Sequence, residues 1–225
     1  MLYESEMIKK EFDWQTLPEI KYLGFLIKFD DDVEVFFERN KELTEVYERA
    51  RASRMFFAQA AKQTKPWRIG AYLRAGLGEF VSIEDAARGD WKKFTNSHKP
   101  PSLKDSVDPL IYMMYLTRNI NVHAHRTKTR SDQSTVFLND PKNPQEFEIN
   151  IDVLDDKFED RLINSRDALK SCEIDDLKDI CGWIKAKQNI FGVGHLFRKG
   201  LSSYCRQIIA KYNKLIQPNA AASAD

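Results

Sequence analysis

The sequence is poor in the features that mark several familiar protein classes. It has only three cysteines in 225 residues, Cys172, Cys181 and Cys205. Their wide spacing gives none of the CxxC pairs of zinc or redox sites, so we expect ordinary reduced thiols. No glycine-rich phosphate loop, internal repeat or low-complexity segment is present. The chemistry must therefore come from individual side chains on a globular scaffold.

Long apolar runs are also missing. The uncharged run at residues 109–117 is far shorter than the roughly 20 apolar residues that span a bilayer. The opening stretch MLYESEMIKKEFDW mixes acids with bases from the start, unlike the charge pattern of a secretory signal. The expectation is a soluble, cytoplasmic protein.

Excess charge is absent overall, because the formal net charge is only +1. The distribution is uneven, however, and acids are missing from two windows, Pro109–Ser131 and Ile180–Ala224. One acid-free window is commonly just a solvated helix face. Two of them, one containing histidines, favour a site for a polyanion.

Helical periodicity dominates what is present, and the 42% hydrophobic content is enough for a substantial core. Ser106 or Asp108 can cap a helix whose body is PLIYMMYLTRNINVHAH, residues 109–125. The glycines Gly70, Gly76 and Gly78 are expected to let a neighbouring backbone come close. The other expected helical segments are Asp31–Lys62, Pro66–Gly89, Asp156–Cys172, and Ile174–Gln217 with a break near Gly192 and Gly194.

A β-hairpin is expected between these helices. The runs STVFL and QEFEINIDV have β-type composition and flank NDPKNP, an Asn/Pro-rich turn. The sequence therefore predicts a mainly α fold, a helical bundle with a small β-hairpin insertion at about 134–153. One domain would cover residues 1–217, and residues 218–225 would form a disordered tail.

The stretch TRNINVHAHRTKTR, Thr117–Arg130, carries the residue types that cut RNA without a metal. Attack by a neighbouring 2′-hydroxyl needs a base, an acid and a cation on the phosphate. His123 and His125 can exchange protons near neutral pH. The guanidinium of Arg118 matches phosphate oxygens in a bidentate way, and Asn119 could orient a histidine or donate to the phosphate.

RNINVH, at the end of a long apolar helix, resembles the R-x4-6-H motif of HEPN domains. The resemblance implies a four-helix-bundle, homodimeric, metal-independent endoribonuclease of the toxin–antitoxin or phage-defence type, without cofactor, in which an antitoxin or other regulatory protein is a possible partner. It implies that Arg118 and His123 are the catalytic pair, with Asn119 as the polar residue after the arginine. Next to this motif, the cations expected to hold flanking phosphates are Arg126, Lys128 and Arg130.

Helix geometry leaves the working histidine open. On a continuous helix, His123 lies roughly 140° around the axis from Arg118, whereas His125 lies within about 20°. Three alternatives follow: the helix loosens near His123, the site is composed across a dimer interface, or His125 does the work.

Two other classes of function compete with the ribonuclease. In one, Arg118 pairs with a carboxylate of the bundle, the histidines lie idle on the surface, and the protein is a catalytically silent interaction or regulatory module. In the other, the HxH pair binds a metal ion, which would need further ligands. Neither His98 nor His195 stands in a pattern of ligand spacing, so no metal is expected.

Overall fold

The computed structural model describes residues 9–19, 31–93, 99–124, 129–138 and 145–216. For residues 31, 121–124, 129–138 and 145–150 it describes the backbone alone. The predicted tail and the predicted hairpin turn, residues 218–225 and 139–144, lie outside the described residues. The predicted boundaries of a single domain stay a prediction.

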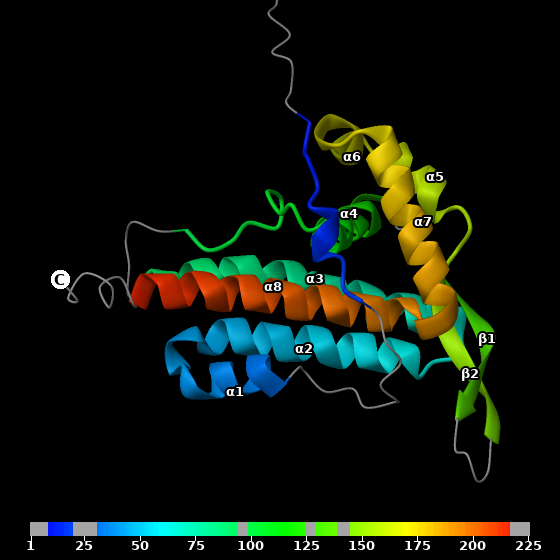
Figure 1. Ribbon diagram of the computed structural model, residues 1–225, viewed down its shortest axis with the longest axis horizontal. Helices are drawn as coiled ribbons and strands as arrows, with labels where there is room; N and C mark the ends of the chain where they lie inside the picture. Colours follow the sequence, from blue (N-terminus) through cyan, green and yellow to red (C-terminus); the bar gives the residue numbers. More distant parts are fainter. Residues whose placement is uncertain (1–8, 20–30, 94–98, 125–128, 139–144, 217–225) are drawn as a thin grey trace, which may run out of the picture.

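The fold is mainly helical, as the sequence predicts (Figure 1). The first half contains α1 (Asp31–Arg39), α2 (Thr44–Ala61), α3 (Pro66–Trp91) and α4 (Pro109–Ala124), with short 3₁₀ turns at Trp14–Thr16 and Lys41–Leu43. The strands β1 (Thr129–Leu138) and β2 (Gln145–Leu154) follow. The second half contains α5 (Phe158–Ile163), α6 (Arg166–Ser171), α7 (Ile174–Phe191) and α8 (Val193–Ile216).

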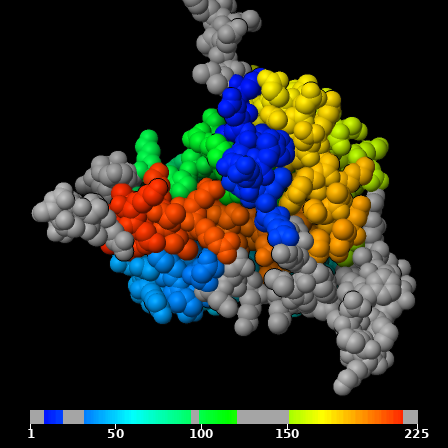
Figure 2. Space-filling view, in the orientation of Figure 1, coloured from blue at the N-terminus to red at the C-terminus, as the bar shows by residue number. Residues whose placement is uncertain are grey.

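The long helices α2, α3 and α8 lie side by side and form the body of the molecule (Figure 1). The central position belongs to α8, which packs against α1, α2, α3, α4 and α7. Across one end of this body lies the hairpin, next to the end of α2 and the start of α3. The segment 9–19 crosses the surface between α4 and α6 (Figure 2). It is held there because Lys10 N–H donates to the Ser171 carbonyl at 2.8 Å and Asp13 N–H to that of Val107 at 2.9 Å.

The prediction of one continuous helix over Asp31–Lys62 is wrong. The helix stops at Arg39, Asn40 leaves helical geometry with φ −107° and ψ 82°, and α2 begins at Thr44. The Asn40 side-chain amide donates to the Phe36 carbonyl at 2.7 Å, a local bond that competes with helix continuation. The apolar repeat does not reveal this break, because Leu43, just after the break, continues the repeat and is fully buried.

Other predicted helices hold with adjusted ends. Pro66 begins α3, which runs two residues past Gly89 to Trp91. The segment Asp156–Cys172 contains two short helices rather than one, α5 and α6. The predicted break near Gly192 is confirmed, and Gly192 takes a positive φ of 79°, which a residue with a side chain rarely adopts.

Three helices begin at a buried carboxylate. The Asp108 side chain caps α4 and accepts from the N–H groups of Leu110 and Ile111 at 2.9 and 3.1 Å. Asp90, at the end of α3, accepts from Val46 N–H at 3.2 Å in the first turn of α2. Asp152 in β2 accepts from Gly194 N–H at 2.7 Å at the start of α8. A carboxylate there satisfies free N–H groups and complements the helix dipole. In two of the three cases the cap comes from another element, so the cap also holds the two elements together.

The predicted hairpin is confirmed, and its first strand begins earlier than expected, at Thr129 rather than near residue 134. The strands pair antiparallel, with Thr129 opposite Leu154 and Leu138 opposite Gln145. Its inner end is fixed to α7 by Gln188, whose side-chain oxygen accepts from Leu154 N–H at 2.9 Å and whose amide donates to the Leu154 carbonyl at 3.4 Å. The amide thus pairs with β2 as a neighbouring strand would.

The apolar residues of the helices form one core cluster that reaches from Val33 in α1 to Tyr212 in α8. All three cysteines lie buried as free thiols, in agreement with the expectation. Within the described part of the chain, no helix is long and apolar enough to cross a bilayer.

Candidate active site at the end of helix α4

Helix α4 is apolar around its whole circumference until its last turns. The residues of IYMMYL are buried except for Tyr115, which is partly buried, so this run belongs to the core. Asp108 caps the helix, and Pro109 opens it where a missing N–H costs nothing. Arg118 and Asn119 are the first polar side chains after Thr117 to reach partial exposure. The end of the helix therefore positions a cation and an amide at the surface, next to the core.

The Arg118 guanidinium has little to hold it within the protein. One of its terminal nitrogens donates to the Asn119 side-chain oxygen at 3.3 Å, and its buried Nε has no hydrogen-bond partner. Among the described residues no carboxylate forms an ion pair with it, so the pairing with a bundle acid that the silent-module alternative requires is not seen there. An arginine has five N–H donors in a planar fork. Apart from the donor that bonds to Asn119, none of them is engaged by a described residue.

The structure brings Arg118 and Asn119 together and limits the roles of the histidines. Residue 123 lies within α4, which continues without a break to Ala124. The backbone is helical through Ala124, which places position 123 roughly 140° around the axis from Arg118 and speaks against the alternative in which the helix loosens near His123. A site across a dimer interface and a site that uses His125 both remain.

The remaining predicted site residues fall mostly outside what the structure describes. His125, Arg126 and Lys128 lie outside the described residues. Arg130 lies in β1, opposite Val153 of β2. The predicted phosphate-holding cations are thus distributed between a short connecting segment and the first strand of the hairpin.

The histidine that the structure does describe is an unsuitable proton carrier. Burial, helped by the charges of Arg198 and Lys199, lowers the pKa of His195 to about 4, so its ring is neutral near pH 7. Among the described side chains, no three His, Cys, Asp or Glu residues lie near enough to one another to hold a metal ion. His123 and His125 are not among those side chains.

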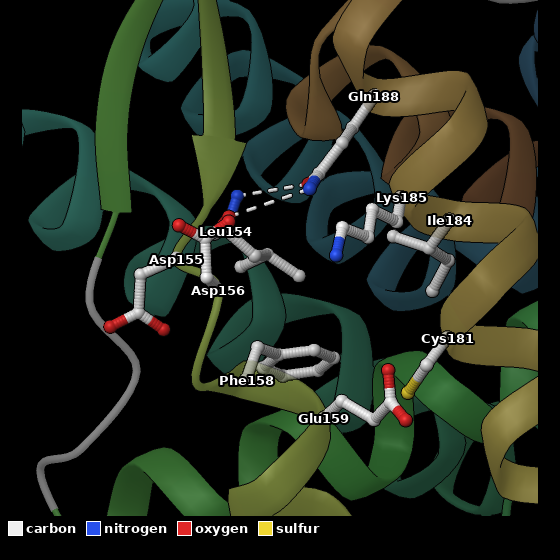
Figure 3. A pocket seen from close by; sticks show the side chains of 9 residues that line it. All are labelled: Leu154, Asp155, Asp156, Phe158, Glu159, Cys181, Ile184, Lys185 and Gln188. Carbon is white, nitrogen blue, oxygen red and sulfur yellow. Dashed lines mark hydrogen bonds between the residues drawn. The ribbon is translucent and has the colours of Figure 1, made fainter.

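A pocket of about 330 Å³, open solvent included, lies between the end of β2, α5 and α7 (Figure 3). Its charged lining consists of Asp155, Asp156, Glu159 and Lys185, so carboxylates outnumber cations and RNA would be repelled. Burial raises the pKa of the Cys181 thiol in its wall to about 12, which removes it as a nucleophile at neutral pH. The pocket is therefore no rival to the end of α4.

A cationic surface lies where α2 ends and α3 begins. On sequence alone, Trp67, Arg68 and Arg74 fit either a basic RNA track with a stacking aromatic or a solvated helix face. Between Glu48 and Glu79 the chain has seven bases and no acid, a longer acid-free window than the one around Arg118. We call its exposed part the α2–α3 corner. The corner consists of Lys62, Lys65, Trp67, Arg68 and Arg74.

Comparisons with known protein families, with curated proteins and with solved structures gave no match.

Proposed function

We propose that the protein is a metal-independent endoribonuclease of the HEPN type that acts on single-stranded or loop RNA in the cytoplasm. The observation that carries the proposal is the half-buried Arg118 guanidinium, whose fork is held by Asn119 alone among the residues that the structure describes. It stands at the end of a capped, core-embedded helix in a mainly helical protein. A cation positioned in this way and left without a carboxylate suits an anionic ligand.

In the proposed reaction, the RNA 2′-oxygen attacks the adjacent phosphorus and the bond to the 5′-oxygen breaks. A histidine, His123 or His125, takes the 2′-hydroxyl proton, and a protonated histidine gives one to the leaving 5′-oxygen. The products are a 2′,3′-cyclic phosphate and a 5′-hydroxyl. Arg118 stabilises the charge that builds on the phosphate oxygens, most strongly in the partly desolvated position that it occupies.

The active form in this proposal is a homodimer. Because α4 is continuous, position 123 faces away from Arg118 within one chain, and a two-fold axis near the helix ends would let one chain's arginine meet its partner's histidine. The body of α4 is buried within the chain. The dimer contact is therefore formed by surfaces around the end of α4.

The silent helical module remains as a second candidate, favoured by one observation. The angle between positions 118 and 123 on an unbroken helix keeps the motif pair apart within a single chain. If the chain is monomeric and His125 does not contribute, no proton carrier of this motif reaches the phosphate. Such a protein would bind a partner, as a member of a regulatory or defence complex, without cutting RNA.

Cleavage of a labelled mixed-sequence RNA in EDTA tests the proposal. The wild type should cut, and Arg118→Ala should lose about 10²- to 10⁴-fold in rate, in line with the loss of a transition-state cation. Arg88→Ala is the control, because Arg88 is an exposed arginine near the end of α3 and is paired with Glu84 and Asp85. Products ending in a 2′,3′-cyclic phosphate, and dependence on one of His123→Ala or His125→Ala, would complete the case. Absence of cutting by a folded wild-type protein would favour the silent module.

A further inference from the structure

We infer that the α2–α3 corner is a binding surface for single-stranded RNA, in which cations hold the phosphates and Trp67 stacks on a base. The inference rests on the proposed function for its choice of RNA as the ligand. It adds a surface separate from the residues of the motif, placed on other helices.

Within the described part of the chain, no acid pairs with the cations of the corner. Lys62 closes α2, Lys65 lies in the turn, and Arg68 and Arg74 lie on α3; all four are exposed. None of them forms an ion pair with a described residue. In the same acid-free window, by contrast, Arg49 and Arg54 are paired with Glu79 and Glu34. Two arginines earlier in the window are thus paired with acids, whereas the four cations of the corner are not paired with any described residue.

Aromatic surface accompanies this charge. Trp67 is 67% exposed and is the most exposed of the large apolar side chains that the structure describes. The Arg68 guanidinium lies 5.2 Å from the centre of the indole ring. One helical turn after Arg68, Tyr72 is half-buried and packs against Phe56 of α2 at a ring separation of 6.4 Å. Rings and guanidinium groups interleaved with lysines are the combination that binds single strands without base specificity.

The corner lies at the end of the molecule where the hairpin attaches. Helix α3 contacts β1 there, and α2 contacts β2 (Figure 1). Strand β1 begins a few residues after α4 ends. A strand of RNA bound at the corner could therefore pass along β1, where Arg130 lies, toward the end of α4. In this arrangement the corner positions the RNA and Arg118 acts on one phosphate of it.

Binding can be measured independently of cleavage with a fluorescein-labelled 12-nucleotide 2′-O-methyl RNA, which has no 2′-hydroxyl to attack. Fluorescence anisotropy with the full chain at several salt concentrations gives the affinity and its salt dependence. Trp67→Ala should bind about 5- to 150-fold more weakly, and Trp67→Phe should recover most of the affinity because a ring remains. The triple variant Lys62→Ala, Lys65→Ala, Arg68→Ala should lower the slope of log K against log salt by about 2.

The matched control is a triple variant of exposed lysines elsewhere, Lys92→Ala, Lys104→Ala and Lys214→Ala. It makes the same change in net charge and should leave the slope unchanged. The inference is overturned if the corner variants bind like the wild type, or if the control triple loses as much as the corner triple. A duplex of the same sequence should compete at least tenfold less well than the single strand, and equal competition would also overturn it.

The outcomes separate this inference from the proposed chemistry. If RNA binds through the corner but no RNA is cut, the ribonuclease proposal fails and the binding surface stands. If RNA is cut with dependence on Arg118 while the corner variants bind and cut normally, the binding surface fails alone.

Discussion

At the scale of single residues, Asp152 shows how a polar group can be placed in the core. Its carboxylate is only 2% exposed, accepts from Gly194 N–H, and lies so close to Gly192 and Gly194 that neither position has room for a side chain. Burial raises the pKa of Asp152 to about 7, although the hydrogen bond from Gly194 opposes the shift. The proton is therefore held more tightly in the folded chain than in the unfolded chain.

This difference predicts a pH dependence of stability. The folded pKa lies above the unfolded value near 4, so the contribution of Asp152 is greatest in acid and is lost as the pH rises from about 4 to about 7. The side chain of Asp152→Asn cannot ionise, so the variant does not lose this contribution. Its free energy of unfolding relative to that of the wild type should therefore increase by up to about 4 kcal/mol between pH 4 and pH 7. Urea titrations followed by circular dichroism at pH 4, 5.5 and 7 would measure it. The exposed Asp179→Asn should track the wild type, and an Asp152→Asn profile parallel to the wild type would contradict the assignment.

A second residue-scale prediction concerns Gln188, which is 5% exposed. Gln188→Ala would leave both the N–H and the carbonyl of Leu154 without their partner. Two buried polar groups left unpaired should cost about 2–4 kcal/mol. Chemical unfolding would show the loss, and the exposed neighbour Asn189→Ala provides the control. A cost below about 0.5 kcal/mol would mean that the side-chain amide does not hold β2.

At the scale of elements, the pair α2 and α3 shows what a sequence pattern can and cannot predict. The glycines were expected to let a neighbouring backbone come close, but at Gly76 the close neighbour is a side chain, since a Cβ atom would lie 2.5 Å from the Phe57 ring. The expectation is wrong at Gly78, where a Cβ atom would meet nothing within 4 Å. Periodicity finds the helix, but which side of it meets a neighbour depends on tertiary packing. The sequence pattern did not predict the break at Asn40, because the apolar repeat continues across it.

The two glycines therefore predict opposite effects of the same substitution. Gly76→Ala forces the buried Phe57 ring to move and should cost about 1–3 kcal/mol. Gly78→Ala removes backbone freedom from the unfolded chain without a clash and should add about 0.5–1 kcal/mol. Thermal and urea unfolding of both variants would test the packing of α2 on α3. Equal effects of the two substitutions would refute it.

At the scale of the whole molecule, the sequence predicted the mainly helical fold and the hairpin, because composition and periodicity determine elements locally. It also indicated that Arg118 leaves the core at the end of an apolar helix. It did not indicate how far the α2–α3 corner is exposed, because ion pairs such as Arg49 with Glu79 join residues 30 positions apart. Charge windows predict where cations occur, and the fold decides which of them remain unpaired.

A composite site across a dimer can be tested by complementation. Arg118→Ala and His123→Ala chains, co-expressed with different tags, should each be inactive alone. A mixed dimer in which each site takes its arginine from one chain and its histidine from the other has one intact site of two. Random pairing should then restore about a quarter of the wild-type activity. No recovery in purified mixed dimers would place both groups of each site in one chain, whereas activity of the His123→Ala chain alone would point to His125.

The central place of α8 also concerns the order in which the chain is made. It is the last described helix to leave the ribosome, yet it contacts α1, α2, α3 and α4. Until it emerges, these helices have apolar faces with nothing to cover them, and the Asp152 carboxylate has no helix to cap. Nascent chains that have reached only Phe191 should therefore bind chaperones and be sensitive to proteases, and a premature stop before α8 should remove the whole fold rather than its last helix.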